Sequence, residues 1–99
     1  MNLNNFSDVE YINLITYKND GSSVTTPVWV APQGHSLVVT TSLNAGKVKR
    51  IRNNGRATIY ITNQSGSQKL SESLDVRGSI ITEPEEKAQA VGIIKKKYG

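Results

Sequence analysis

Residues that could hold a phosphate group are concentrated in one stretch of the chain, residues 41–52. The stretch opens with small polar residues, among them Ser42, and a short cationic helix is predicted to follow. The first N–H groups of a helix have no intrahelical partner and carry partial positive charge, so they attract anions. Gly46 would let the backbone approach a ligand closely, and Lys47 would add a full charge. The pattern therefore favours a phosphate site.

The same helix also has a purely structural interpretation. Val48 and Ile51 lie three residues apart, so they share a face that can dock on a sheet. The cations beside that face are then solvated, as charge runs usually are, with Asn44 as the N-cap and Gly55 ending the helix in the left-handed conformation. The spacing alone does not decide between the two interpretations.

Length and composition limit the class of protein. The chain has 99 residues, a net charge of +4 and no cysteine, which excludes disulfides, thiol nucleophiles and thiolate zinc sites. We expect one domain, residues 1–99, with a core small enough to favour a dimer. No apolar run is long enough for a membrane span and no signal peptide is apparent, so we expect a cytoplasmic protein without a membrane partner.

Strand patterns dominate the chain as far as residue 82. We predict strands at 11–18, 24–31, 37–41, 57–63 and 70–82 from β-branched residues and alternation. Asn19-Asp20-Gly21 predicts a tight hairpin turn. Pro27 cannot donate a ladder hydrogen bond, so it predicts a sheet edge or a bulge.

A second helix is predicted near the end of the chain. Thr82 and Glu85 have the spacing of a capping box, Pro84 suits the first turn, and three lysines suit the last. Ala88, Val91, Ile94 and Tyr98 would form its apolar face. The order β-β-β-α-β-β-α predicts a mainly β fold with two helices, mostly antiparallel and curled into a small barrel.

No hydrolytic triad, paired carboxylates or metal cluster is evident in the sequence, and the single histidine, His35, lies on a predicted turn. We therefore predict no catalytic side chain and no metal site. Any chemistry would belong to a bound cofactor that the protein orients.

Three segments together resemble one protein family. Residues 14–21, 24–30 and 46–52 are similar to the flavin split-barrel proteins, and the Thr-Pro-Val-Trp run at 26–29 with the Gly-Lys-Val-Lys-Arg run at 46–50 is the specific combination. This is the pyridoxamine 5'-phosphate oxidase-like group, and the nearest branch contains deazaflavin-dependent reductases. Arg77-Gly78 and the terminal Lys97-Tyr98-Gly99 match that branch as well. The resemblance covers residues 11–99.

The resemblance implies a split β-barrel homodimer that binds FMN or a deazaflavin at the dimer interface. Thr41 and Lys47, with Arg50 nearby, match the positions that hold the cofactor phosphate. Thr26, Val28 and Trp29 match the strand beside the isoalloxazine ring. Two departures are apparent: Ala45 replaces the usual serine before the Gly-Lys pair, and relatives continue beyond the Lys-Tyr-Gly with more helix and a final strand, which is missing here.

Three functions remain open, in this order. The first is a cofactor-dependent oxidoreductase that transfers hydride to a small-molecule substrate. The second is a non-catalytic family member that binds a flavin, a haem or no cofactor. The third is a small basic β-barrel that binds nucleic acid through its arginines and lysines, with Tyr60 or Trp29 stacking on bases.

Overall fold

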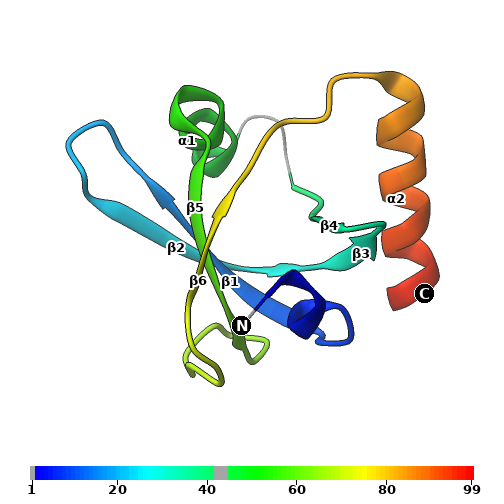
Figure 1. The fold of residues 1–99 in the computed structure, drawn as a ribbon, viewed down its shortest axis with the longest axis horizontal. Helices are drawn as coiled ribbons and strands as arrows, with labels where there is room; N and C mark the ends of the chain where they lie inside the picture. The colour runs from blue at the N-terminus through cyan, green and yellow to red at the C-terminus, as the bar shows by residue number, and fades with distance from the viewer. Residues whose placement is uncertain (1, 42–44) are drawn as a thin grey trace.

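The structure, a computed structural model, describes residues 2–41 and 45–99 (Figure 1). It is mainly β with two α-helices, as the sequence predicts. The elements in chain order are η1 (Leu3–Phe6, a 3₁₀ helix), β1 (Tyr11–Tyr17), β2 (Ser23–Trp29), β3 (Ala31–Gln33), β4 (Ser36–Val38), α1 (Gly46–Asn54), β5 (Arg56–Thr62), β6 (Leu74–Arg77) and α2 (Pro84–Tyr98).

Four strands form one antiparallel sheet in the order β2-β1-β5-β6, and β3 pairs with β4 in a separate hairpin. The register of β1 and β2 runs without interruption from Tyr11↔Trp29 to Tyr17↔Ser23. Pro27 therefore lies on an edge strand and not at a bulge, which resolves the alternatives left by the sequence. Within the described residues the sheet ends at β2 and at β6, and no closed barrel forms.

One face of this sheet carries the main core. Side chains alternate across a strand, so every second residue of β1, β2 and β5 points to the same side. Those residues pack with the N-terminal segment; the fully enclosed members of the cluster are Phe6, Ile12, Val28, Val30 and Ile59. Helix α1 packs against β1 and β5 and buries Val48 and Ile51, the two residues predicted to dock.

Helix α2 stands at the other end of the molecule, beside the β3–β4 hairpin (Figure 1). Its buried residues are Ala90 and Ile94, which pack against Ala31 and Val38. The predicted apolar face is correct in part: Ile94 is buried and Tyr98 packs against the same cluster, but Ala88 and Val91 are exposed. Apolar residues occur on several sides of this helix, so their spacing predicts a helix without determining which side is buried.

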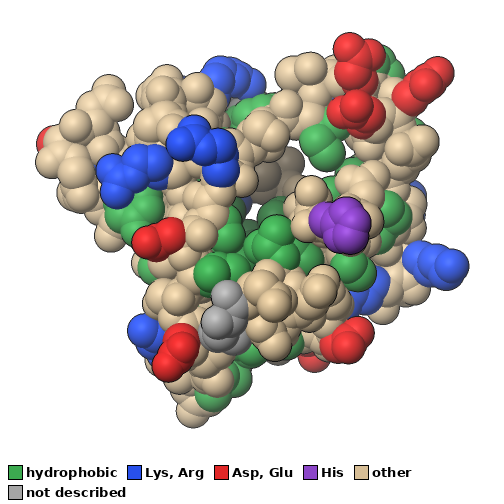
Figure 2. Space-filling view, viewed as in Figure 1, with side chains coloured by type: hydrophobic (Ala, Val, Ile, Leu, Met, Phe, Trp, Pro, Cys, Tyr) green, Lys and Arg blue, Asp and Glu red, His purple; other side chains and the backbone are tan. Residues whose placement is uncertain are grey.

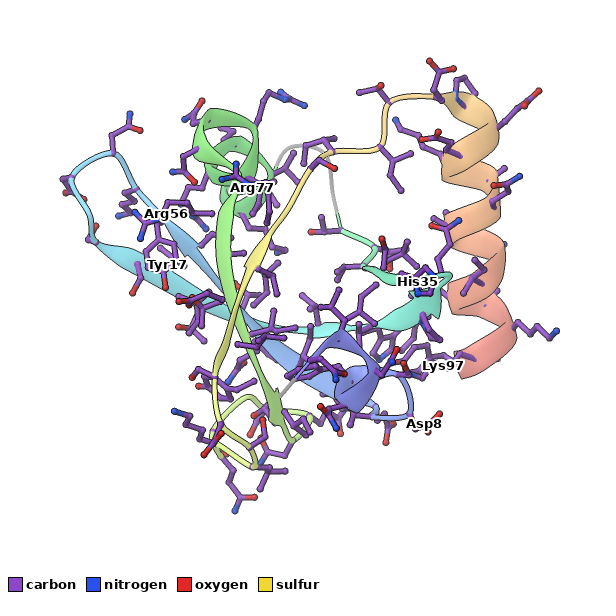
Figure 3. All side chains as sticks on the ribbon, viewed as in Figure 1. Asp8, Tyr17, His35, Arg56, Arg77 and Lys97 are labelled. Atoms are coloured by element: carbon purple, nitrogen blue, oxygen red, sulfur yellow. The ribbon has the colours of Figure 1, made fainter. Side chains whose placement is uncertain are left out.

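Polar contacts join the C-terminal turn of α2 to the segment before β1 and to Val30, between β2 and β3. The Lys97 ammonium donates to the carbonyl oxygens of Ser7, Val9 and Val30 at 3.0, 2.7 and 2.6 Å. Figure 3 shows Lys97 at this end of the molecule, on the same side as Asp8. Burial lowers the pKa of Lys97, and the nearby Asp8 carboxylate acts in the opposite direction. Lys97 therefore has a structural role: it holds the end of α2 against the carbonyl oxygens of Ser7, Val9 and Val30.

Three details differ from the sequence-based expectations. The strand predicted at 70–82 is formed only at Leu74–Arg77, and the strand predicted to end at 31 divides into β2 and β3. The N-cap of α2 is Glu83, without a side-chain cap hydrogen bond, so the predicted capping box at Thr82 is absent. The predicted N-cap of α1, Asn44, lies outside the described residues, whereas Gly55 ends that helix at a φ of 68° as predicted.

Candidate functional site

An open cleft of about 350 Å³ lies beside the end of strand β2. Its walls come from β1, β2, the segment after β4 and the first turn of α1, and the lining residues are Tyr11, Pro27, Val28, Trp29, Thr40, Thr41 and Lys47. Four of these are residues that the sequence analysis assigned to a cofactor: Val28, Trp29, Thr41 and Lys47. The fold thus brings Val28 and Trp29 close to Thr41 and Lys47, although more than ten residues separate Trp29 from Thr41 in the sequence.

The cationic wall of the cleft is Lys47, in the first turn of α1. The helix begins at Gly46 after Ala45, whose side chain gives no cap hydrogen bond. Docking of Val48 and Ile51 on the sheet fixes the orientation of the helix, and Lys47 is left half-buried on the flank of that docked face. Its ammonium and the partial positive charge at the start of the helix both favour an anion.

The aromatic wall is Trp29, the last residue of β2. Its side chain is 44% exposed, and its indole stacks on the ring of Tyr98 with centroids 4.5 Å apart. The Tyr98 hydroxyl accepts a hydrogen bond from the Val30 N–H at 3.0 Å and lies 2.6 Å from the Glu10 carbonyl oxygen, to which it can donate. Desolvation by burial raises the pKa of Tyr98. Trp29 is therefore held in place from one side and open on the other.

Three of the predicted site residues do not line the cleft. Arg50 donates from Nε to the hydroxyl of the buried Thr16 at 2.5 Å. A Cβ placed on Gly46 would lie 2.7 Å from the Arg50 guanidinium, so the missing side chain of Gly46 makes room for Arg50. Thr26 lies half-buried on β2, two residues before Val28. Arg50 and Gly46 thus lie against each other and are not among the residues that line the cleft.

The remaining predicted residue, Ser42, lies outside the described residues. The sequence analysis did not assign Tyr11, Pro27 or Thr40 as ligands, although all three line the cleft. The position of Tyr11 beside Trp29 could have been predicted, because a tight hairpin that pairs Tyr17 with Ser23 also pairs Tyr11 with Trp29. Thr40 has no comparable signal, because its position depends on how the segment after β4 crosses to α1.

The chemistry of the cleft is that of a binding site. It offers one ammonium group, two threonine hydroxyls and an apolar wall of aromatic and aliphatic side chains. In the part of the chain that the structure describes, no group of three or more His, Cys, Asp or Glu side chains could hold a metal ion. No helix in that part is long and apolar enough to cross a membrane.

The chain matches no protein-family model, and neither a curated protein nor a solved structure is significantly similar to it.

Proposed function

We propose that this protein binds FMN or a deazaflavin in the cleft beside β2 and, with it, transfers hydride to a small-molecule substrate. The observation that supports the proposal best is the meeting of Val28 and Trp29 with Thr41 and Lys47 around one cleft. These residues come from the two segments that carry the resemblance to the flavin split-barrel proteins. The split barrel itself remains part of the proposal.

The residues present fit such a cofactor in their chemistry. Lys47 and Thr41 supply the cation and hydroxyl that a phosphate group requires, and Trp29, Tyr11 and Val28 supply an apolar wall for a planar ring. A volume of about 350 Å³ is at the lower end of the roughly 300–1,000 Å³ of small-molecule sites. A second subunit would supply the remaining enclosure, so we include a homodimer in the proposal.

Each residue has a definite role in this account. Lys47 neutralises the phosphate charge, and Thr41 donates its hydroxyl to a phosphate oxygen. The exposed side of Trp29 and the side chain of Val28 cover one side of the ring and exclude water from it. The flavin or deazaflavin supplies the hydride chemistry when it is bound, and the protein orients it.

The proposal is tested by replacing Lys47 with alanine and titrating FMN by fluorescence. Loss of one charge-assisted contact costs about 1.5–3 kcal/mol, which raises the dissociation constant roughly ten- to hundredfold. Lys49→Ala is the matched control, because Lys49 carries the same charge on the same helix and is exposed outside the cleft. Equal affinities for the two variants would remove Lys47 from the site.

A non-catalytic member of the same family is the second candidate function. It is favoured by the position of Arg50, which is bonded to Thr16 and leaves Lys47 as the one cleft-lining cation among the described residues. Ala45 also lacks the hydroxyl that relatives place beside the phosphate. Such a protein would bind FMN without oxidising a nicotinamide or reducing a substrate. Stopped-flow absorbance of the protein–FMN complex with NADPH distinguishes the two functions.

A further inference from the structure

A second polar depression, of about 280 Å³, lies on the far end of the sheet from Trp29. It is formed by the paired ends of β1, β5 and β6, and its lining residues are Tyr17, Arg56, Ala57, Thr58, Asp75, Val76 and Arg77. Arg56 and Arg77 are directly opposite each other in the antiparallel register of β5 and β6. Figure 3 shows both arginines close to Tyr17 at this end of the molecule.

Two arginines in this relationship repel each other. Residues directly opposite on antiparallel strands have Cβ atoms about 4.5–5.5 Å apart, and like charges there are destabilising. The only carboxylate among the lining residues is Asp75. Its Oδ1 accepts a hydrogen bond from the Thr58 hydroxyl at 2.8 Å. Counting these three charged groups, the depression keeps a net charge of +1, and an anion between the guanidinium groups would relieve their repulsion.

The Arg56 side chain also lies against an aromatic ring. The guanidinium carbon of Arg56 lies 4.8 Å from the centroid of the Tyr17 ring, in a cation–π contact. The Tyr17 hydroxyl is 2.6 Å from the Thr58 hydroxyl, so Tyr17, Thr58 and Asp75 form one hydrogen-bonded chain that fixes the ring. Side chains that are already ordered lose less conformational entropy when a ligand binds.

Arg77 lies at the same depression, beside the backbone of Gly55. Gly55 has a φ of 68°, and a Cβ added to it would lie 3.4 Å from Nη1 of Arg77 and 3.3 Å from the Gly78 carbonyl oxygen. The Gly78 N–H donates to the Gly55 carbonyl at 2.8 Å, which joins the start of β5 to the end of β6. The Arg77 guanidinium thus lies beside Gly55, where the start of β5 meets the end of β6.

The surrounding surface has the same sign of charge. Basic side chains gather over α1 and the neighbouring ends of β5 and β6, whereas acidic side chains gather at the start of α2 (Figure 2). Helix α1 contains four cations and no acidic residue in the sequence Gly-Lys-Val-Lys-Arg-Ile-Arg-Asn-Asn. A field of one sign raises the local concentration of an oppositely charged ligand.

From these observations we propose that Arg56 and Arg77 form a binding site for a phosphate-type anion, separate from the cleft at Lys47. The two guanidinium forks bind the oxygens of one phosphate group, since arginine matches phosphate geometry with two parallel N–H donors. The phosphate belongs to a small molecule, because the depression is small and its one aromatic ring is already covered by Arg56. The proposal does not depend on the flavin site.

Isothermal titration calorimetry with pyrophosphate, at low ionic strength, tests this site in the full chain. Wild-type protein should bind one pyrophosphate saturably, and Arg56→Gln and Arg77→Gln should each weaken binding at least tenfold. Lys96→Gln, which removes an equal charge from an exposed position on α2, should change the affinity less than twofold. Lys49→Gln, which removes a charge from α1 outside both sites, should also bind pyrophosphate like the wild type. The titration contains no FMN, so failure of the flavin proposal and failure of this one give different results.

Two results would overturn the anion site. One is equal affinity for pyrophosphate in wild type, Arg56→Gln and Arg77→Gln. The other is no binding of pyrophosphate together with salt-sensitive binding of a single-stranded oligonucleotide, which would assign the arginines to a nucleic-acid backbone. A thermal melt provides an independent readout: pyrophosphate should raise the Tm of the wild type and leave that of Arg77→Gln unchanged.

Discussion

The indole of Trp29 and the ring of Tyr98 stack with their planes only 6° apart, which joins the last residue of β2 to the last residue of α2. These residues are 69 positions apart in the sequence. The stack closes one side of Trp29 and leaves its other side toward the cleft that Lys47 also lines. The C-terminal helix therefore sets the shape of the candidate site without itself lining it.

We expect Tyr98→Phe to lower stability and to alter its dependence on pH. The substitution leaves the N–H of the buried Val30 without its acceptor, at a cost of about 1–3 kcal/mol. Burial raises the pKa of Tyr98 in the folded protein above the ordinary value of 10.0, so the unfolded chain ionises first. The contribution of Tyr98 to stability is thus complete below pH 10 and is lost as pH rises through the folded pKa.

Urea unfolding of both proteins between pH 8 and 11 measures this effect. The free energy of unfolding should fall more steeply above pH 10 in the wild type than in Tyr98→Phe. Lys97, whose pKa is lowered by burial, contributes the opposite slope in both proteins and cancels in the comparison. If the free energy of unfolding changed with pH in the same way in both proteins, the Tyr98 hydroxyl would make no pH-dependent contribution to stability.

Two glycine-to-alanine substitutions should have opposite effects on stability. Gly66 has a φ of 75°, and a Cβ there would lie 2.8 Å from Oδ1 of the buried Asn13 and 3.2 Å from Pro27. Alanine in the left-handed region costs about 1–2 kcal/mol before any clash, so Gly66→Ala should lower the free energy of unfolding by at least that much.

Gly92 is the matched control, because it is exposed within α2 and a Cβ added there would have no neighbouring atom within 4 Å. Replacement of a mid-helix glycine by alanine stabilises a helix by about 0.5–1 kcal/mol. Chemical denaturation should therefore order the proteins Gly92→Ala, wild type, Gly66→Ala. A stable Gly66→Ala would mean that the 63–67 turn rearranges readily around Asn13.

The proposed homodimer has a direct physical test. A second subunit would add walls to a cleft that is open in one chain, and would bury more apolar surface than this small core does alone. Light scattering at micromolar concentration should give about twice the chain mass of 10.8 kDa. A measured mass equal to that of one chain at micromolar concentration would exclude the dimer.

Local signals in the sequence predict most of the elements. The turn at 19–21 sets the β1–β2 pairing, and Val48, Ile51 and Gly55 set the docked face and the end of α1. The sequence pattern overestimates the length of β6, because alternation continues through 70–82 although only Leu74–Arg77 pairs with β5. The alternation of apolar and polar residues indicates which side chains face the core. It does not indicate where the hydrogen-bonded pairing of β6 with β5 ends.

The candidate site was predictable only in part. Val28 and Trp29 are assigned to the site only by the family resemblance, Lys47 follows also from its place in the first turn of a cationic helix, and all three line one cleft. The position of Arg50 could not be deduced, because its bond to Thr16 joins residues 34 positions apart. The pairing of Arg56 with Arg77 depends equally on the register of β5 and β6, which no local pattern determines.

The most direct test of the central proposal is the emission of Trp29, the only tryptophan in the chain, during titration with FMN. Free tryptophan corrects for absorption of light by the flavin, and riboflavin serves as the ligand without a phosphate. We predict saturable quenching by FMN, or by a deazaflavin, with weaker quenching by riboflavin because Lys47 then has no anion to bind. Emission that FMN leaves unchanged after correction, but that a single-stranded oligonucleotide quenches until salt is added, would contradict the cofactor proposal.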